Sequence, residues 1–330
     1  MSFAKIALEE HVDVPKSING WQYVAQQGSV QGEKRPYTPA PVDGLLALMD
    51  ANGIEMSVLS LTQAAVECIP VKELSVRVAR DSNDYIAEQV TKNPKRLQAW
   101  ATLPMLDPEA ASLELVRCVK ELGFKGTMVK GFCQVGAGDQ VAYYDQPEYD
   151  EFWATVASLD VPFYLHPRYP MPHGIQSIAG HSWFRGSVWG FGVETATHTL
   201  RLMASGIFDR YPKLTVILGH LGETLPNAVW RIDHRLAKEK QQLPAQKKFA
   251  EYLRNNFYLT TSGNFCTHTL QDTIAEVGAD RILFSVDYPY ESVEQAAKWF
   301  DSCEISEANR LKIGRSNAEK LLKMSTAASA

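Results

Sequence analysis

The chain has 330 residues, of which 45% are hydrophobic, and this length is sufficient for a large buried core. Its 38 acidic and 33 basic residues give a formal net charge of −5 without any basic stretch, which excludes nucleic acid as an expected partner. No apolar run reaches the roughly 20 residues of a membrane span, and the N-terminus lacks the apolar core of a signal peptide, so we expect a cytoplasmic protein with no membrane partner.

Short apolar runs alternate with amphipathic stretches along the chain. The runs have the length and continuous apolar character of parallel strands buried on both faces. They lie at 5–10, 56–62, 96–103, 124–131, 161–167, 213–220, 257–264 and 281–289. Stretches with helical periodicity separate them, at 42–53, 72–92, 109–123, 147–160, 195–211, 225–239, 268–278 and 293–303. This order predicts an α/β fold, a single (β/α)8 TIM-type barrel over residues 1–330, and it favours the barrel over an open doubly wound sheet.

Two segments are longer than simple connections and carry several aromatic residues. Residues 12–42 include Trp21 and Tyr23, and residues 168–192 include Trp189 and Phe191. Long loops in a compact domain usually form lids or interfaces, so we expect them at the C-terminal face of the barrel. The apolar stretch 183–191 also predicts a homo-oligomer, a tetramer or a dimer, because a monomer rarely exposes so much apolar surface.

Ligand-type side chains stand where four of the predicted strands end. Glu9 and His11 end the first strand, His166 the fifth, His220 the sixth and Asp287 the eighth. Parallel strands of a barrel place their C-terminal ends around one mouth, where barrel enzymes carry their active sites. Carboxylates and imidazoles together suit a divalent cation, Zn²⁺ first and Mn²⁺ or Mg²⁺ as alternatives. The pattern therefore predicts a metal site.

Six motifs make the chain similar to the amidohydrolase superfamily. They are ALEEH at 7–11, FYLHPR at 163–168, ILGHLGE at 217–223, WRIDHR at 230–235, TTSGNF at 260–265 and FSVDYPYE at 284–291. They resemble the branch that contains aminocarboxymuconate semialdehyde decarboxylase, γ-resorcylate decarboxylase and 2,3-dihydroxybenzoate decarboxylase.

The resemblance implies one metal ion, bound by Glu9, His11, His166 and Asp287, without an organic cofactor. The first strand carries ExH, whereas the binuclear relatives carry HxH and a carboxylated lysine on the fourth strand. Lys130 ends the fourth strand here, so a second metal stays an alternative.

The activity that the resemblance implies is the non-oxidative decarboxylation of an ortho-hydroxybenzoic acid to a phenol and CO2. Asp287 is the expected proton donor, and Glu223 is expected to orient His220 beside the substrate hydroxyl. A metal that binds both the carboxylate and the ortho-oxygen would fix the ring. The expected substrate-binding residues are Arg231, Trp21, Tyr23, Phe191 and Tyr290.

Two other interpretations stay open at this point. The same scaffold could hydrolyse a lactone or an amide, with the metal activating water and Asp287 acting as base. A non-catalytic barrel is the third, which the ligand-type residues on four strands disfavour. The sequence does not choose among 2,6-dihydroxybenzoate, 2,3-dihydroxybenzoate, salicylate and orsellinate-like substrates.

Overall fold

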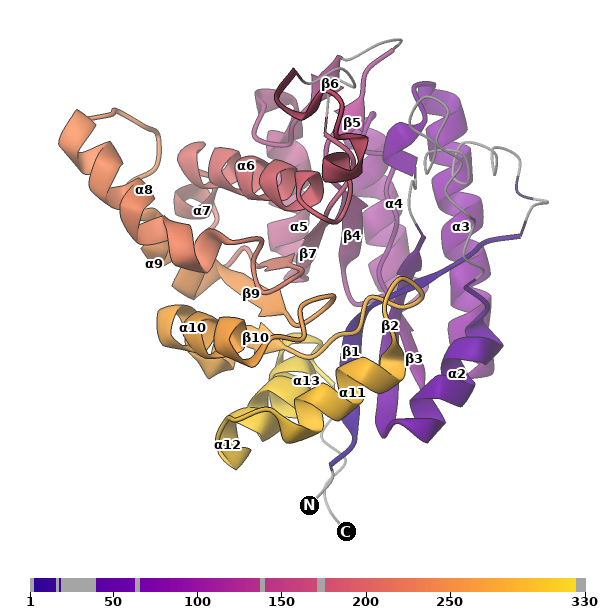
Figure 1. The fold of residues 1–330 in the computed structure, drawn as a ribbon. Coiled ribbons are helices and arrows are strands. Elements are labelled where there is room, and N and C mark those ends of the chain that lie inside the picture. Colours follow the sequence, from indigo (N-terminus) through magenta and orange to yellow (C-terminus); the bar gives the residue numbers. More distant parts are fainter. Residues whose placement is uncertain are drawn as a thin grey trace.

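The computed structural model describes residues 3–15, 18, 40–62, 66–136, 140–170 and 176–324. Within these ranges, eight parallel strands form the centre of the molecule (Figure 1). They are β1 (Lys5–Val12), β2 (Ile54–Leu61), β3 (Leu97–Ala99), β4 (Thr127–Lys130), β7 (Phe163–His166), β8 (Val216–Leu218), β9 (Phe257–Thr260) and β10 (Ile282–Leu283). A short antiparallel hairpin, β5 (Cys133–Gln134) with β6 (Val141–Ala142), lies beyond β4.

The strands close into a barrel through two single bridges. A three-stranded group, β1-β2-β3, and a five-stranded group, β10-β9-β8-β7-β4, each pair in parallel. Ala101, just after β3, pairs with Thr127 of β4, and Glu10 of β1 pairs with Tyr288, just after β10. The His11 amide donates to the Tyr288 carbonyl at 2.7 Å across the second junction. The predicted (β/α)8 architecture is therefore confirmed.

Helices form an outer layer around the strands (Figure 1). Asp107 and Ser292 cap α4 and α11 by accepting from the Ala110 and Gln295 amides, as expected for short polar side chains at helix starts. No helix among the described residues is both long and apolar enough to cross a bilayer. The helices are α2 (Val42–Ala51), α3 (Lys72–Lys92), α4 (Pro108–Lys120), α5 (Asp150–Leu159), α6 (Gly190–Ala204), α7 (Ile207–Arg210), α8 (Leu225–Glu239), α9 (Phe249–Asn256), α10 (Thr267–Val277), α11 (Val293–Ser302), α12 (Glu307–Leu311) and α13 (Asn317–Leu321).

Two apolar clusters explain why the runs are apolar on both faces. One fills the interior of the barrel with side chains from seven of the strands and with Trp100, which directly follows β3, and Ala318 and Leu322 from the C-terminal segment pack against its lower end. The other lies between the strands and the helices. Burial on both faces is typical of parallel sheets, and it holds the strand ends in fixed positions.

Some predicted boundaries were wrong. The last strand was predicted over 281–289, but β10 ends at Leu283 and the backbone reaches φ 82° at Asp287, outside the extended region. The helix predicted over 195–211 starts at Gly190, inside the predicted loop. It also divides into α6 and α7, because Gly206 adopts φ 73°. Tertiary contacts and glycine conformation override periodicity at these points.

Candidate metal centre

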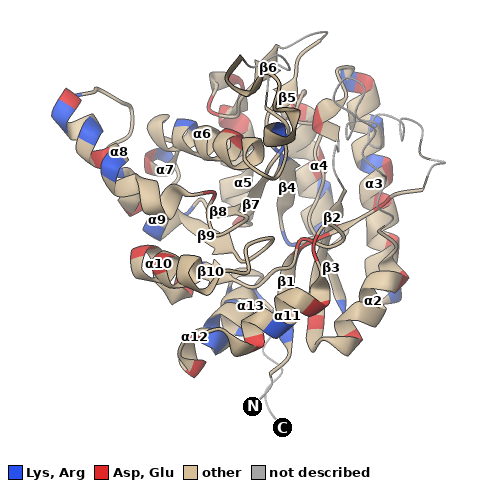
Figure 2. Cartoon of the chain, in the orientation of Figure 1, with Lys and Arg blue, Asp and Glu red and all other residues tan. Residues whose placement is uncertain are grey.

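Four ligand-type side chains meet at the upper end of the barrel. They are Glu9 and His11 on β1, His166 at the end of β7, and Asp287 after β10, and one donor atom of each lies within 4.8 Å of all the others. Figure 2 shows acidic residues at the upper end of β1, inside the ring of strands, whereas most charged residues lie on the helices. Glu9, His11 and His166 are buried, and the Asp287 side chain is 14% exposed.

A break in strand register turns Glu9 and His11 into the barrel. Ile6 and Leu8 of β1 already point into the barrel core, so strict alternation would send Glu9 to the opposite face. The pairing of β1 with β2 shifts register between Ala7 and Glu10. Such irregularities re-aim side chains next to active sites. Glu9 consequently reaches the interior, where it meets Tyr164.

One carboxylate oxygen of Glu9 accepts three hydrogen bonds, and the other accepts none. Glu9 Oε2 accepts hydrogen bonds from the hydroxyls of Tyr164, Thr260 and Ser262. Glu9 Oε1 is buried without a hydrogen-bond partner, and so is His166 Nε2, 3.2 Å away. Buried polar atoms are rarely left unsatisfied, so these two atoms fit a cation bound between them.

Both ligand histidines present the ring nitrogen that a metal needs. His166 Nδ1 donates to the Pro167 carbonyl at 2.9 Å, and His11 Nδ1 lies 2.6 Å from Ser60 Oγ, so each Nε2 faces the centre. Burial, together with the charge of Lys130, lowers the pKa of His11 well below its ordinary value and that of His166 to about 4. Both rings are neutral at pH 7, which is the form that binds a cation.

Asp287 connects the ligand group with His220. Its Oδ1 lies 3.0 Å from His11 Nε2, and its Oδ2 lies 3.7 Å from His220 Nε2. Burial raises the pKa of the Asp287 carboxyl to about 7. A non-glycine residue with φ 82° is strained, and such strain persists only where the surroundings impose it. Glu10 imposes it here, because its carboxylate accepts from the amides on either side, Val286 and Tyr288.

His220 and Glu223 form the pair that the sequence predicted. His220 Nδ1 lies 2.6 Å from Glu223 Oε1, and the backbone of both residues is left-handed, with φ 52°. Burial disfavours the charged imidazole, but Glu223 and Asp287 outweigh it and raise the pKa of His220 well above its ordinary value. Its Nε2 therefore carries a proton toward the centre at neutral pH.

Lys130 lies behind His11 rather than in the centre. Its Nζ is 3.1 Å from His11 Nδ1 and 3.4 Å from Met128 Sδ, on the side of the ring away from Asp287. Burial lowers the pKa of the Lys130 amine to about 8. This position favours Lys130 as a neighbour of the ligand His11 over Lys130 as a ligand to a second ion.

The predicted substrate residues lie at different distances from this group. The Tyr290 ring is 5.7 Å from the His11 ring, and Phe191 is buried against Tyr169. Arg231 is exposed on α8, and among the described residues it forms no ion pair with Glu9 or Asp287. Trp21 and Tyr23 fall outside the described residues. These assignments stay predictions.

Sequence reasoning missed the hydroxyl groups that hold the ligands. Tyr164, Thr260 and Ser262 bind Glu9, and Ser60 binds His11. The run TTSGNF offered a signal, since three hydroxyl residues in a row at a strand end are unusual for a fully apolar strand. Ser60 offered none, because serine in a strand is common on any face.

We expect purified protein to contain about one divalent metal ion per chain. The four donors form the single group of His, Cys, Asp and Glu placed to hold an ion within the part of the chain that the structure describes. Elemental analysis of chelated and reloaded protein measures the ratio. Two ions per chain, or a mass increase of Lys130 by one CO2, would contradict the single-ion assignment.

Comparisons with known proteins place this chain among relatives of defined activity. The family model described as amidohydrolase matches residues 28–324. A γ-resorcylate decarboxylase of a Rhizobium strain is 49% identical over 97% of this chain and 98% of its own. The crystal structure of a 2,6-dihydroxybenzoate decarboxylase with 2,6-dihydroxybenzoate superposes with a TM-score of 0.89 at 47% identity, covering 98% of this chain and 100% of that one.

A Polaromonas dihydroxybenzoic acid decarboxylase structure, with bound manganese and 2-nitroresorcinol, has a TM-score of 0.87 and 48% identity over 97% of both chains. The family resemblance predicted from six motifs is thus confirmed over almost the whole length. The chain belongs to the amidohydrolase family, in the branch of the γ-resorcylate decarboxylases and aminocarboxymuconate semialdehyde decarboxylase.

Proposed function

We propose that this protein is a metal-dependent decarboxylase of ortho-hydroxybenzoic acids, with 2,6-dihydroxybenzoate as its first candidate substrate. The carrying observation is the buried group of Glu9, His11, His166 and Asp287, with His220 beside it. The γ-resorcylate and 2,6-dihydroxybenzoate decarboxylases that align over almost the full length support the choice of substrate.

Glu9, His11, His166 and Asp287 would hold the metal, which supplies positive charge for the substrate's carboxylate and neighbouring oxygen. The donor set of two carboxylates and two imidazoles suits Zn²⁺, the ion predicted from the sequence. It also suits Mn²⁺, which the related Polaromonas structure holds. The activity of the protein loaded with Zn²⁺ therefore needs to be compared with that of the protein loaded with Mn²⁺.

Asp287 is the proposed proton donor. Its Oδ2 faces His220 whereas its Oδ1 faces His11, so one carboxyl oxygen is free to carry a proton to the substrate. The proton moves from Asp287 to the ring carbon that bears the carboxylate. The bond to the carboxylate then breaks, CO2 leaves, and the electron pair of that bond restores the aromatic ring. Asp287 is left as a carboxylate and regains its proton from solvent.

His220 is proposed to act on the ortho-hydroxyl group. Glu223 fixes the imidazole by its 2.6 Å contact with Nδ1, so Nε2 keeps one direction. An imidazole in this position can exchange a proton with the hydroxyl as charge moves into and out of the ring. Tyr290 and Phe191 are the proposed aromatic contacts among the described residues, and Arg231 is the proposed partner of the acid.

The test is to assay the hydroxybenzoate isomers side by side, following CO2 and the phenol formed. We expect 2,6-dihydroxybenzoate and other 2-hydroxy acids to react, because a cation held by the four ligands would attract the carboxylate and an ortho-oxygen together, but not a meta- or para-oxygen. We expect 3- and 4-hydroxybenzoate to be inert or weak inhibitors. Equal turnover of 4-hydroxybenzoate would contradict the mechanism, and hydrolysis of an ester or lactone without CO2 would favour the hydrolase alternative.

A homo-oligomer, as a tetramer or dimer, is proposed from an exposed apolar surface on the segment before and within α6. Trp183, Val188, Trp189 and Val193 are each at least 46% exposed. Apolar area of this kind usually marks an interface. We expect Trp183→Ser with Trp189→Ser to lower the mass measured by light scattering, whereas Leu113→Ser on α4, 67% exposed, leaves it unchanged. A monomeric unmodified chain at micromolar concentration would end this proposal.

A further inference from the structure

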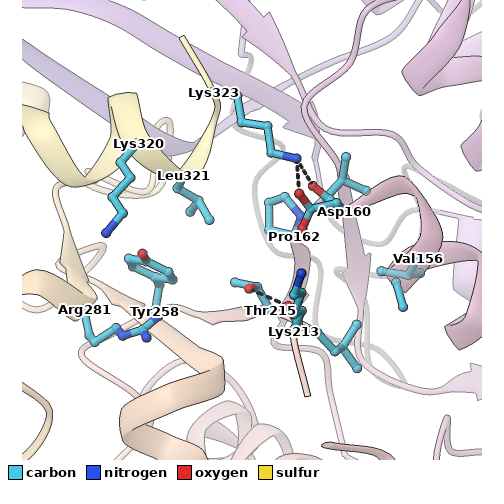
Figure 3. Close-up of a pocket in the computed structure, with 13 residues that line it drawn as sticks. Val156, Asp160, Pro162, Lys213, Thr215, Tyr258, Arg281, Lys320, Leu321 and Lys323 are labelled. Atoms are coloured by element: carbon cyan, nitrogen blue, oxygen red, sulfur yellow. Dashed lines mark hydrogen bonds and ion pairs between the residues drawn. The ribbon is translucent and has the colours of Figure 1, made fainter. Parts of the chain in front are cut away.

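The lower end of the barrel contains a hollow that the proposed reaction does not use. Its volume is about 170 Å³, and it is lined by the segments that lead into β7 and β8, by Tyr258 of β9 and by the C-terminal helix α13 (Figure 3). These segments are the N-terminal ends of the strands, whereas the four metal ligands lie at or beyond the C-terminal ends. The hollow therefore lies at the opposite end of the barrel from the metal centre.

Positive charge accumulates around this hollow. The lining includes four basic side chains, Lys213, Arg281, Lys320 and Lys323, and one acid, Asp160. Lys323 Nζ donates to the carboxylate of Asp160 and, at 2.6 Å, to its carbonyl, so this acid is already paired. The lining therefore carries a surplus of three positive charges, although the whole chain has a net charge of −5. Such like charges repel one another unless an anion joins them.

Three of the cations have no acidic partner in the part of the chain that the structure describes. Within the described ranges, no ion pair is formed by Lys213, Arg281 or Lys320. In Figure 3, Lys320 and Arg281 lie on one side of the hollow together with Tyr258, and Lys213 lies across from them. These side chains come from segments far apart in the sequence, so the fold itself brings the charges together.

Tyr258 and the backbone give the hollow fixed walls. Tyr258 is only 6% exposed, and the Arg281 guanidinium stacks on its ring at 5.0 Å from the ring centroid, which limits the freedom of both side chains. Across the hollow, Asp160 and Lys323 both adopt left-handed backbone, with φ 51° and 50°, and their ion pair joins the two strained positions. The walls are thus ordered before any ligand binds.

We propose that this hollow is a second ligand site, which binds a small multivalent oxyanion with phosphate chemistry. Three unpaired cations and the Tyr258 hydroxyl can surround such an anion, whereas a single carboxylate would use only one or two of them. The volume accommodates a phosphate group with a few waters or a short substituent. The bound anion links α13 to the strands and stabilises the lower end of the barrel.

The experiment measures phosphate binding to the metal-loaded protein by calorimetry and by melting temperature, against chloride at equal ionic strength. We expect binding by the unmodified chain and a rise in Tm of roughly 3 °C at saturating phosphate. Lys213→Met with Lys320→Met should weaken binding at least about 10-fold. Arg281→Met, made without the lysine changes, is a second test of the same site and should also weaken phosphate binding. The matched control is Lys298→Met, which removes one exposed lysine from α11.

A parallel titration with glycerol 3-phosphate distinguishes a phosphate ester from free phosphate as the better ligand, and either result supports the site. The Asp287→Asn variant must retain phosphate binding, because the hollow is separate from the metal centre. Unchanged phosphate binding by the variant that lacks Lys213 and Lys320 would overturn the proposal. Loss of phosphate binding in Asp287→Asn alone would overturn it as well, because the anion would then bind at the metal. Absence of binding at millimolar phosphate would overturn it as well.

Discussion

Replacing Asp287 with asparagine is expected to lower turnover at least about 1,000-fold, the upper range for a general acid. The amide keeps the size of the side chain but loses both the proton for the ring carbon and the negative charge that faces His11 at 3.0 Å. Metal affinity should fall as well, because the donor set then keeps one carboxylate charge instead of two. Steady-state kinetics on 2,6-dihydroxybenzoate and elemental analysis measure the two effects.

The control for this variant is Asp280→Asn, which changes an exposed carboxylate paired with Lys312 and should leave both measurements unchanged. Restoring full metal content with excess ion separates the two roles of Asp287. If turnover returned together with the metal, Asp287 would be a ligand only, and the proton donor would have to be sought elsewhere.

Removal of the His220 imidazole by alanine substitution is expected to lower kcat roughly 100-fold while the protein keeps its metal. His220 Nε2 stays 3.9 Å from Glu9 Oε1 and 3.7 Å from Asp287 Oδ2, outside the group of four donors. Added imidazole should restore part of the rate, since the lost side chain leaves space beside Asp287. Glu223→Gln should give a smaller loss, because it weakens the orientation of His220 without removing the ring.

His268→Ala on α10 serves as the matched histidine control, since its side chain is exposed and lies on the outer layer. The division of roles would be wrong if His220→Ala released the metal and regained full turnover once metal was added back. In that case His220 would act as a ligand, and the ortho-hydroxyl would need a different partner.

The sequence was sufficient for the barrel and for the identities of the four ligands. Continuous apolar runs and strand-end polar residues depend on local pattern, and the four donors do converge. The turn of Glu9 into the barrel could not be predicted, because it depends on a register break that alternation does not reveal. The same holds for Glu10, whose bonds to the Val286 and Tyr288 amides join residues almost a whole chain apart.

Surface features were harder to predict than the centre. The cations around the lower hollow come from segments before β8 and β10 and from α13 and the residues after it, so no motif in the sequence gathers them. Arg231 was predicted from a motif shared with relatives, yet motif position does not fix where a side chain on an exposed helix points. Residues whose place depends on long-range packing or on a partner are therefore less accessible to pattern reasoning than residues at strand ends.

Closure of the barrel between Glu10 and Tyr288 has a consequence for biosynthesis. The first ligand is residue 9 and the fourth is residue 287. At about 5–20 residues per second, the ribosome needs roughly 15–55 s to synthesise the chain between them. During that time β1 lacks its last neighbour, and the nascent chain exposes an open strand edge that chaperones can recognise. Any product that terminates before residue 287 lacks both the closing bridge and the fourth ligand. The complete set of four ligands therefore exists only after translation has passed residue 287.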